Sequence, residues 1–322
     1  MKKYISVILT ILFLSIFCIY FFQNQEDFKP LLQLSIPILV IISLLKVLTI
    51  FSMGLFIKIV LKPFKKKMSL AESFYISTLS TIGNYFMPLR GGAGIRAVYL
   101  KKKLKLSYSH FISTLSGNYI ITFAVYSIIG LVSLILIQVK YNISSTILYI
   151  FFITLALVTL TLSLVKIPKR ILEISEKPGI LNRISKILVN IAKGWSFITS
   201  NKSLLVKLLF ITFLNFLITA SITFLGFKSI GVNLTFPSLL LYVSLSGTSL
   251  LISLTPGSIG IREGVLLLSA SIIATTSENI LQVAVIDRGL SFFVLLFLYI
   301  IIKVLTSLKV LPKNYKHEQK KE

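Results

Sequence analysis

The stretch that decides the fold reads TPGSIGIREG and occupies residues 255–264, between two strongly apolar runs. It places a proline and several glycines next to an arginine and a glutamate. Within a bilayer, non-helical backbone and charged side chains are tolerated only where they are buried in protein or line a water-filled cavity. We therefore interpret this stretch as a functional break inside a membrane-embedded element.

An earlier stretch, NYFMPLRGGAGIRA at residues 84–97, follows the same order of features. Each stretch has a proline, a glycine-rich break and then a Gly-Ile-Arg triplet, at residues 94–96 and 260–262. Two such breaks in corresponding positions are typical of inverted repeats, in which the broken elements meet near the middle of the membrane. The sequence therefore predicts that the two stretches face each other.

The composition is that of an integral membrane protein. The 322 residues are 55% hydrophobic and 14% charged, and the mean hydropathy is +0.91. The net charge of +24 comes mainly from basic residues in short segments between apolar runs. Such segments mark the cytoplasmic side of a membrane protein and can contact anionic lipid. The sequence contains no basic face with interleaved aromatic residues, so it does not indicate binding to nucleic acid.

The apolar runs predict an all-α polytopic membrane protein in which residues 1–322 form a single domain. We expect two re-entrant helical hairpins of opposite orientation, at residues 69–101 and 238–276. The distribution of basic residues places both termini in the cytoplasm, in a protein of the cell (plasma) membrane. We expect six full transmembrane helices, at residues 4–22, 31–61, 107–137, 147–165, 204–227 and 280–302.

Two basic segments and one lysine within a predicted span lie outside the two breaks. Residues 166–202 combine basic residues with apolar residues at helical spacing, so they form either an amphipathic helix on an anionic leaflet or a solvated linker. Residues 304–322 are expected to be a basic cytoplasmic tail. Lys46, near the middle of the second span, is either buried against an acidic partner or extended along its helix toward the interface.

The two breaks have the chemistry of an anion site. Glycines let backbone amides face a cavity, helix amino termini carry partial positive charge, and arginine offers a planar donor fork for phosphate or carboxylate. The alternative is that Arg96 and Arg262 are structural and pair with Glu72, Glu263 or Asp287. The candidate residues for binding a lipid head group or anion are Arg90, Gly92, Arg96, Pro256, Gly257, Gly260, Arg262 and Glu263, and the candidate supporting or coupling residues are Asn84, Asp287 and Arg288.

Nothing in the sequence predicts catalysis. Ser258 lies in a GSIG sequence but has no histidine nearby, and no P-loop or dinucleotide fingerprint is present. Cys18 is the only cysteine, so we expect neither a disulfide framework nor a zinc site. We therefore expect no catalytic residue, no metal and no cofactor.

At these residues the chain resembles a known family. PGSIGIREG at residues 256–264 is similar to the Pro-Gly-Gly-Ile-Gly-x-Arg-Glu-Gly signature of the flippase-like family named after the transmembrane region of lysylphosphatidylglycerol synthase. The first stretch resembles that family's Pro-x-Arg-x-Gly-Glu-x-x-Arg motif through Pro88, Arg90, Gly92 and Arg96. The family's glutamate falls on Ala93, which makes the first hairpin more purely cationic.

The resemblance implies a membrane domain that moves lipid head groups between leaflets, and it allows a homodimer. Residues 303–322 leave no room for the cytoplasmic synthase domain of bifunctional relatives, so we expect no lysyltransferase activity. The leading hypothesis is a translocase for an anionic phospholipid or lipid-linked glycan. The alternatives are a proton-coupled transporter of a small soluble anion and a non-catalytic membrane partner of a separate lipid-modifying enzyme.

Overall fold

The computed structural model describes residues 11, 15, 18–23, 25–164, 189, 198–252 and 254–307. Within these residues the chain forms helices and no strand, which confirms the all-α prediction. The expected first span at 4–22, the basic segment at 166–202 and the tail at 304–322 lie largely outside the described residues.

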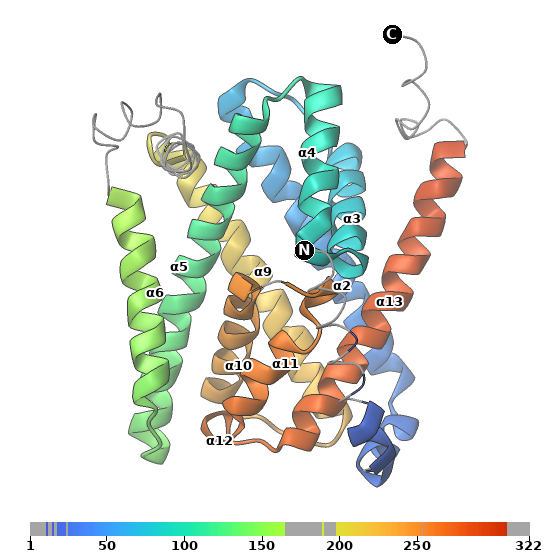
Figure 1. Cartoon of the computed structure of the whole chain (residues 1–322), viewed down its shortest axis with the longest axis vertical. Helices are drawn as coiled ribbons and strands as arrows, with labels where there is room; N and C mark the ends of the chain where they lie inside the picture. Colours follow the sequence, from blue (N-terminus) through green and yellow to red (C-terminus); the bar gives the residue numbers. More distant parts are fainter. Residues whose placement is uncertain are drawn as a thin grey trace.

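Long helices run along the long axis of the molecule (Figure 1). Within the described residues, four of them are long and apolar enough to cross a bilayer: α2 with its following turn, α5, α9 and α13. The sequence thus encodes a multi-pass membrane protein. The long helices are α2 (Ile36–Val60), α5 (Tyr108–Tyr141), α6 (Thr146–Leu164), α9 (Lys202–Ser229) and α13 (Ser277–Ser307).

Apolar side chains face outward and polar side chains lie between helices, as in a protein surrounded by lipid. Large apolar side chains such as Val139, Ile147 and Phe293 are exposed. Small polar side chains lie between helices, where Asn215 Nδ2 on α9 donates to Ser52 Oγ on α2 at 2.9 Å. Because lipid is as apolar as leucine, such interhelical hydrogen bonds and close packing take over much of the role of a hydrophobic core.

The first broken unit consists of α3 (Leu70–Phe86), η3 (Pro88–Arg90) and α4 (Gly91–Leu104). Ser69 caps α3 by accepting a hydrogen bond from the backbone amide of Glu72 at 3.1 Å. Helices α3 and α4 touch through their backbones, because a Cβ atom added to Gly92 would lie 1.7 Å from the carbonyl oxygen of Ser80. The glycine therefore sets the distance between the two helices.

The second broken unit has a longer interruption than the sequence predicted. The first helix of the hairpin ends at residue 248, and the helix that follows the break is interrupted at Ser269. Near the first interruption Thr248 Oγ1 donates to the carbonyl oxygen of Ser244 at 2.8 Å, a side-chain interaction that competes with regular helix. The unit consists of α10 (Phe236–Thr248), η4 (Ser249–Ile252), η5 (Pro256–Ser258), α11 (Ile261–Leu268) and α12 (Ala270–Ile273).

The tips of the two units share a backbone conformation. Pro88 is followed by Leu89 at φ 54° and Arg90 at φ 56°, and Pro256 is followed by Gly257 at φ 58° and Ser258 at φ 55°. Left-handed backbone is unfavourable for residues other than glycine, so its occurrence in pairs after each proline is a structural correspondence. It supports the internal repeat independently of the Gly-Ile-Arg triplets.

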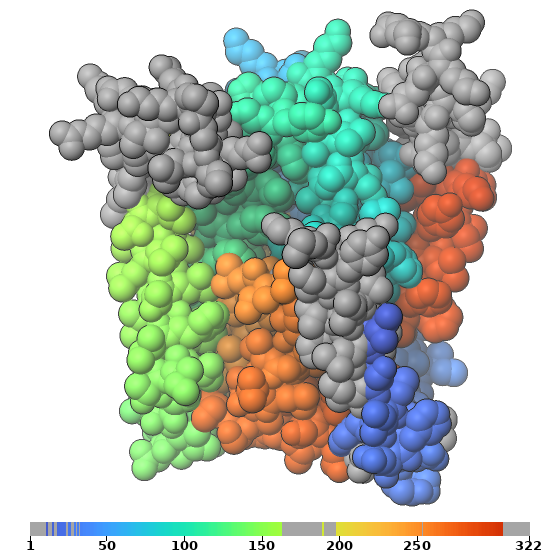
Figure 2. Space-filling model, viewed as in Figure 1, coloured from blue at the N-terminus to red at the C-terminus, as the bar shows by residue number. Residues whose placement is uncertain are grey.

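The two units occupy opposite halves of the molecule. Helices α3 and α4 lie in the upper half and α10 to α12 in the lower half, and the space-filling view shows the two groups stacked one above the other (Figures 1 and 2). Their tips η3 and η5 contact each other. The predicted meeting of the two breaks is therefore present in the structure.

Replacing Gly92 with alanine is expected to destabilise the protein by about 1–3 kcal/mol, because the methyl group would overlap the backbone of α3. The loss of thermal stability in detergent measures this effect. Gly94→Ala is the matched control on the same helix, since a Cβ atom there meets nothing within 4 Å. Equal stability of the two variants would contradict the role given to Gly92.

Candidate functional site: two polar cavities at the helix breaks

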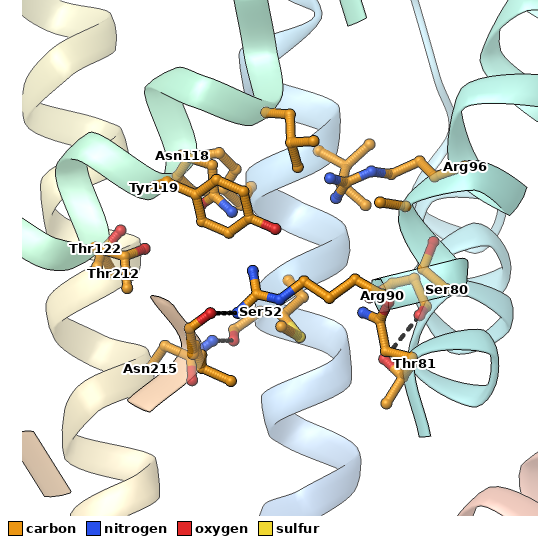
Figure 3. A pocket seen from close by; sticks show the side chains of 18 of the residues that line it. Ser52, Ser80, Thr81, Arg90, Arg96, Asn118, Tyr119, Thr122, Thr212 and Asn215 are labelled. Carbon is orange, nitrogen blue, oxygen red and sulfur yellow. Dashed lines mark hydrogen bonds between the residues drawn. The ribbon is translucent and has the colours of Figure 1, made fainter. Parts of the chain in front are cut away.

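The upper cavity has a volume of about 320 Å³ and lies where η3 and α4 face α5 and α9. Figure 3 shows Arg90 and Arg96 on one side of it, with amide and hydroxyl side chains from α5 and α9 on the other. Ala93 on α4, which lies between Arg90 and Arg96 in the sequence, also lines this cavity. The described lining contains no acidic residue.

The two arginines of the upper cavity contact aromatic rings and backbone. Arg90 Nη2 donates to the carbonyl oxygen of Leu250 at 2.9 Å, and its guanidinium carbon lies 4.7 Å from the centre of the Tyr119 ring. The guanidinium carbon of Arg96 lies 5.4 Å from the centre of the Phe111 ring. Among the described residues neither arginine has a carboxylate partner within 4.0 Å.

In the alternative interpretation, in which Arg96 is a structural residue, Glu72 was one of its predicted partners. Glu72 instead accepts a hydrogen bond from the hydroxyl of Tyr99 at 2.9 Å and pairs with Lys103 at 3.1 Å. The positive charge of Arg96 is therefore available to the upper cavity.

The α3 wall of this cavity offers further polar atoms. Ser80 Oγ and Asn84 Oδ1 are both buried and have no hydrogen-bond partner in the described structure. A buried polar atom without a partner is costly, so these atoms are positioned to bind water or a ligand.

The lower cavity has a volume of about 350 Å³ and lies between α2, α9, α10 and α13. Its charged residues are Lys46, Arg262 and Asp287. Met53, Thr81, Tyr85 and Leu250 line both cavities and therefore form the wall that separates them.

A network of ion pairs surrounds the lower cavity. Asp287 on α13 accepts hydrogen bonds from Lys46 on α2 and, at 2.9 Å, from Arg262 on α11. Lys46 also donates to Ser291 Oγ at 2.9 Å. The contacts of Lys46 with Asp287 and Ser291 correspond to the first of its two predicted roles, burial against an acidic partner. The contact of Arg262 with Asp287 corresponds to the alternative in which Arg262 is a structural residue.

The same network holds the tip of the second unit. Arg288 pairs with Glu263 at 2.8 Å and donates to the carbonyl oxygen of Gly257. Glu263 accepts a hydrogen bond from the backbone amide of Gly260 at 2.9 Å and also pairs with Arg262 at 3.5 Å. The left-handed backbone of this tip is thus fixed by charged side chains.

The predicted site residues fall into four groups. Asn84, Arg90, Arg96 and Gly257 line the upper cavity, whereas Arg262 and Asp287 line the lower one. Gly92 is buried in the contact between α3 and α4 and lines neither cavity. Pro256, Gly260, Glu263 and Arg288 lie at or support the break in the second unit.

Arg96 and Arg262 line different cavities, with Tyr85 and Leu250 in the wall between the upper and lower chambers. Sequence reasoning also missed Tyr119, Thr122 and Asn215 as cavity residues. The signal for the first two was a polar group, with Asn118, at helical spacing within an apolar run.

Comparison with known families agrees with this architecture. The family described as Lysylphosphatidylglycerol synthase TM region matches residues 5–298. The chain belongs to this family. The family links the protein to lipid metabolism. No curated protein and no solved structure matches the chain.

Asp287→Asn is expected to destabilise this family member by about 3–5 kcal/mol, because it leaves Lys46 and Arg262 without their shared counter-charge. Thermal unfolding in detergent measures the loss. The double variant Lys46→Met with Asp287→Asn should lose less than the sum of its single variants, since the two positions interact directly. Strict additivity would show that the Lys46–Asp287 pair contributes nothing to stability.

Proposed function

We propose that this protein is a membrane translocase that moves an anionic or phosphate-bearing lipid or glycolipid head group between leaflets. The observation that carries the proposal is the upper cavity, in which Arg90 and Arg96 have no acidic partner in the described structure. Arginine is the side chain best suited to phosphate, and charge inside a membrane region is costly unless it serves binding or transport. Membership of a family linked to lipid metabolism supports the same reading.

The two cavities suggest how the head group would cross. The upper chamber lies beside the first broken unit and the lower chamber beside the second, with Tyr85 and Leu250 between them. We propose that Arg262 and Asp287, which bind each other here, exchange partners with the head group as it passes the wall. Pro256, Gly257 and Gly260 would shape the backbone on that path, while the acyl chains stay in the bilayer.

For the arrangement in the membrane we propose six spans with two re-entrant hairpins. The connection between α4 and α5 lies at the upper end in Figure 1, and it follows a run of lysines at residues 101–103. By the positive-inside rule this end faces the cytoplasm of a cell membrane, and both termini lie there. A homodimer and a separate lipid-modifying enzyme are the proposed partners.

Replacing Arg90 and Arg96 together with glutamine is expected to slow translocation at least tenfold, because phosphate loses its charged donors. Reconstituted vesicles containing phosphatidylglycerol labelled on an acyl chain, with chemical quenching of the outer leaflet, measure the rate. Lys228→Gln is the control for loss of a positive charge elsewhere, since Lys228 is exposed outside both cavities.

The same assay separates the alternative functions. Unchanged lipid movement in the double arginine variant would overturn the assignment of the upper cavity. Uptake of a soluble anion without lipid movement would identify a proton-coupled transporter using Glu263 or Asp287. Absence of both activities, with co-purification of a lipid-modifying enzyme, would identify a non-catalytic partner.

A further inference from the structure

The two sides of the upper cavity differ in chemistry. Arg90 and Arg96 project from η3 and α4, while the neutral side chains of Asn118, Thr122, Thr212 and Asn215 project from α5 and α9 on the opposite side (Figure 3). The cationic side chains and the amides and hydroxyls therefore come from different helices, and the Arg90 guanidinium reaches across to Tyr119 on α5.

The neutral side retains hydrogen-bonding capacity. Asn215 uses one amide proton on Ser52 Oγ at 2.9 Å, and its side-chain oxygen can accept further hydrogen bonds. On the α3 wall, Ser80 is 7% exposed, and its hydroxyl has no partner in the described structure. The Ser80 hydroxyl therefore has the capacity to bond to a water molecule or to a head-group hydroxyl.

The cavity is unfavourable for an ammonium group. Two arginines line it, and the described lining contains no carboxylate that could pair with a third cation. The Tyr119 ring is already covered by the Arg90 guanidinium, whose carbon lies 4.7 Å from the ring centre. Like charges in a medium of reduced dielectric repel strongly, so an amine-bearing head group would be bound less well than one without an amine.

We propose that the upper cavity selects a head group that joins a phosphate to neutral hydroxyls, as in a glycerol or sugar phosphate, and rejects head groups that carry an amine. The phosphate would lie between Arg90 and Arg96, and the hydroxyls would reach Ser80, Asn118 and Thr122. This assignment of substrate class rests on the proposed lipid translocation, but it makes a separate statement about binding.

Competitive lipid retention tests the selectivity directly. The purified protein is equilibrated in detergent with equal amounts of phosphatidylglycerol, phosphatidic acid and phosphatidylethanolamine of the same acyl chains, and bound lipid is counted by native mass spectrometry. We expect phosphatidylglycerol to exceed phosphatidylethanolamine by about tenfold or more, which corresponds to about 1.4 kcal/mol, because the ammonium group is repelled by the two arginines. Equal or greater retention of phosphatidylethanolamine, or retention of none of the lipids, overturns the proposal.

Variants on the neutral side test the role of the hydroxyls. In the double variant Asn118→Leu with Thr122→Val, we expect the amount of retained phosphatidylglycerol to fall to that of phosphatidic acid, which has no head-group hydroxyl. The amount of retained phosphatidic acid should not change. Thr122→Val alone keeps the shape of the side chain and should give a smaller loss in the same direction. Thr161→Val, on the exposed face of α6, is the matched control. An equal loss of both lipids overturns the hydroxyl assignment.

Comparison with the vesicle assay separates this inference from the proposed function. Selective retention of phosphatidylglycerol without transbilayer movement would support the binding assignment and refute the translocase. Transbilayer movement of all three lipids at equal rates, without selective retention, would support the translocase and refute the selectivity.

Discussion

The structure depends on the shared ion pairing of Asp287 with Lys46 and Arg262. A charge buried among membrane helices is costly unless a partner compensates it, so these three residues constrain α2, α11 and α13 to one arrangement. The adjacent pair of Arg288 and Glu263 extends this constraint to the backbone of Gly257. The polar break of the second unit is stable in the membrane because its charges and exposed backbone groups find partners within the protein.

The first unit is built differently, and this difference is the basis of the functional proposal. Its two helices are held by the close contact of Gly92 with α3 and by the pair of Glu72 and Lys103, neither of which involves Arg90 or Arg96. Arg90 and Arg96 therefore keep their charge for the upper cavity, where they face rings and a carbonyl oxygen. One break is electrostatically closed and the other is open to an anion, although their tips share a left-handed backbone.

Much of the fold could be predicted from hydrophobicity and proline position. The long apolar helices follow from the absence of charge over enough residues to span a bilayer, and the two tips lie at Pro88 and Pro256 as predicted. The extent of the second break could not be predicted, because residues 249–254 are as apolar as the helix before them. Tyr119, Thr122 and Asn215 were missed as cavity residues because polar residues in apolar helices are equally common as helix-packing contacts.

By itself, the sequence determined the class of the protein, the positions of its breaks and the excess of positive charge near them. These properties depend on composition and local backbone preference, which act over short stretches of chain. Only the tertiary structure decided which charges are compensated, because Lys46 and Asp287 are far apart in sequence and meet only when α2 packs near α13. It also separated Arg96 from Arg262, since side chains from different helices build the wall between the two cavities.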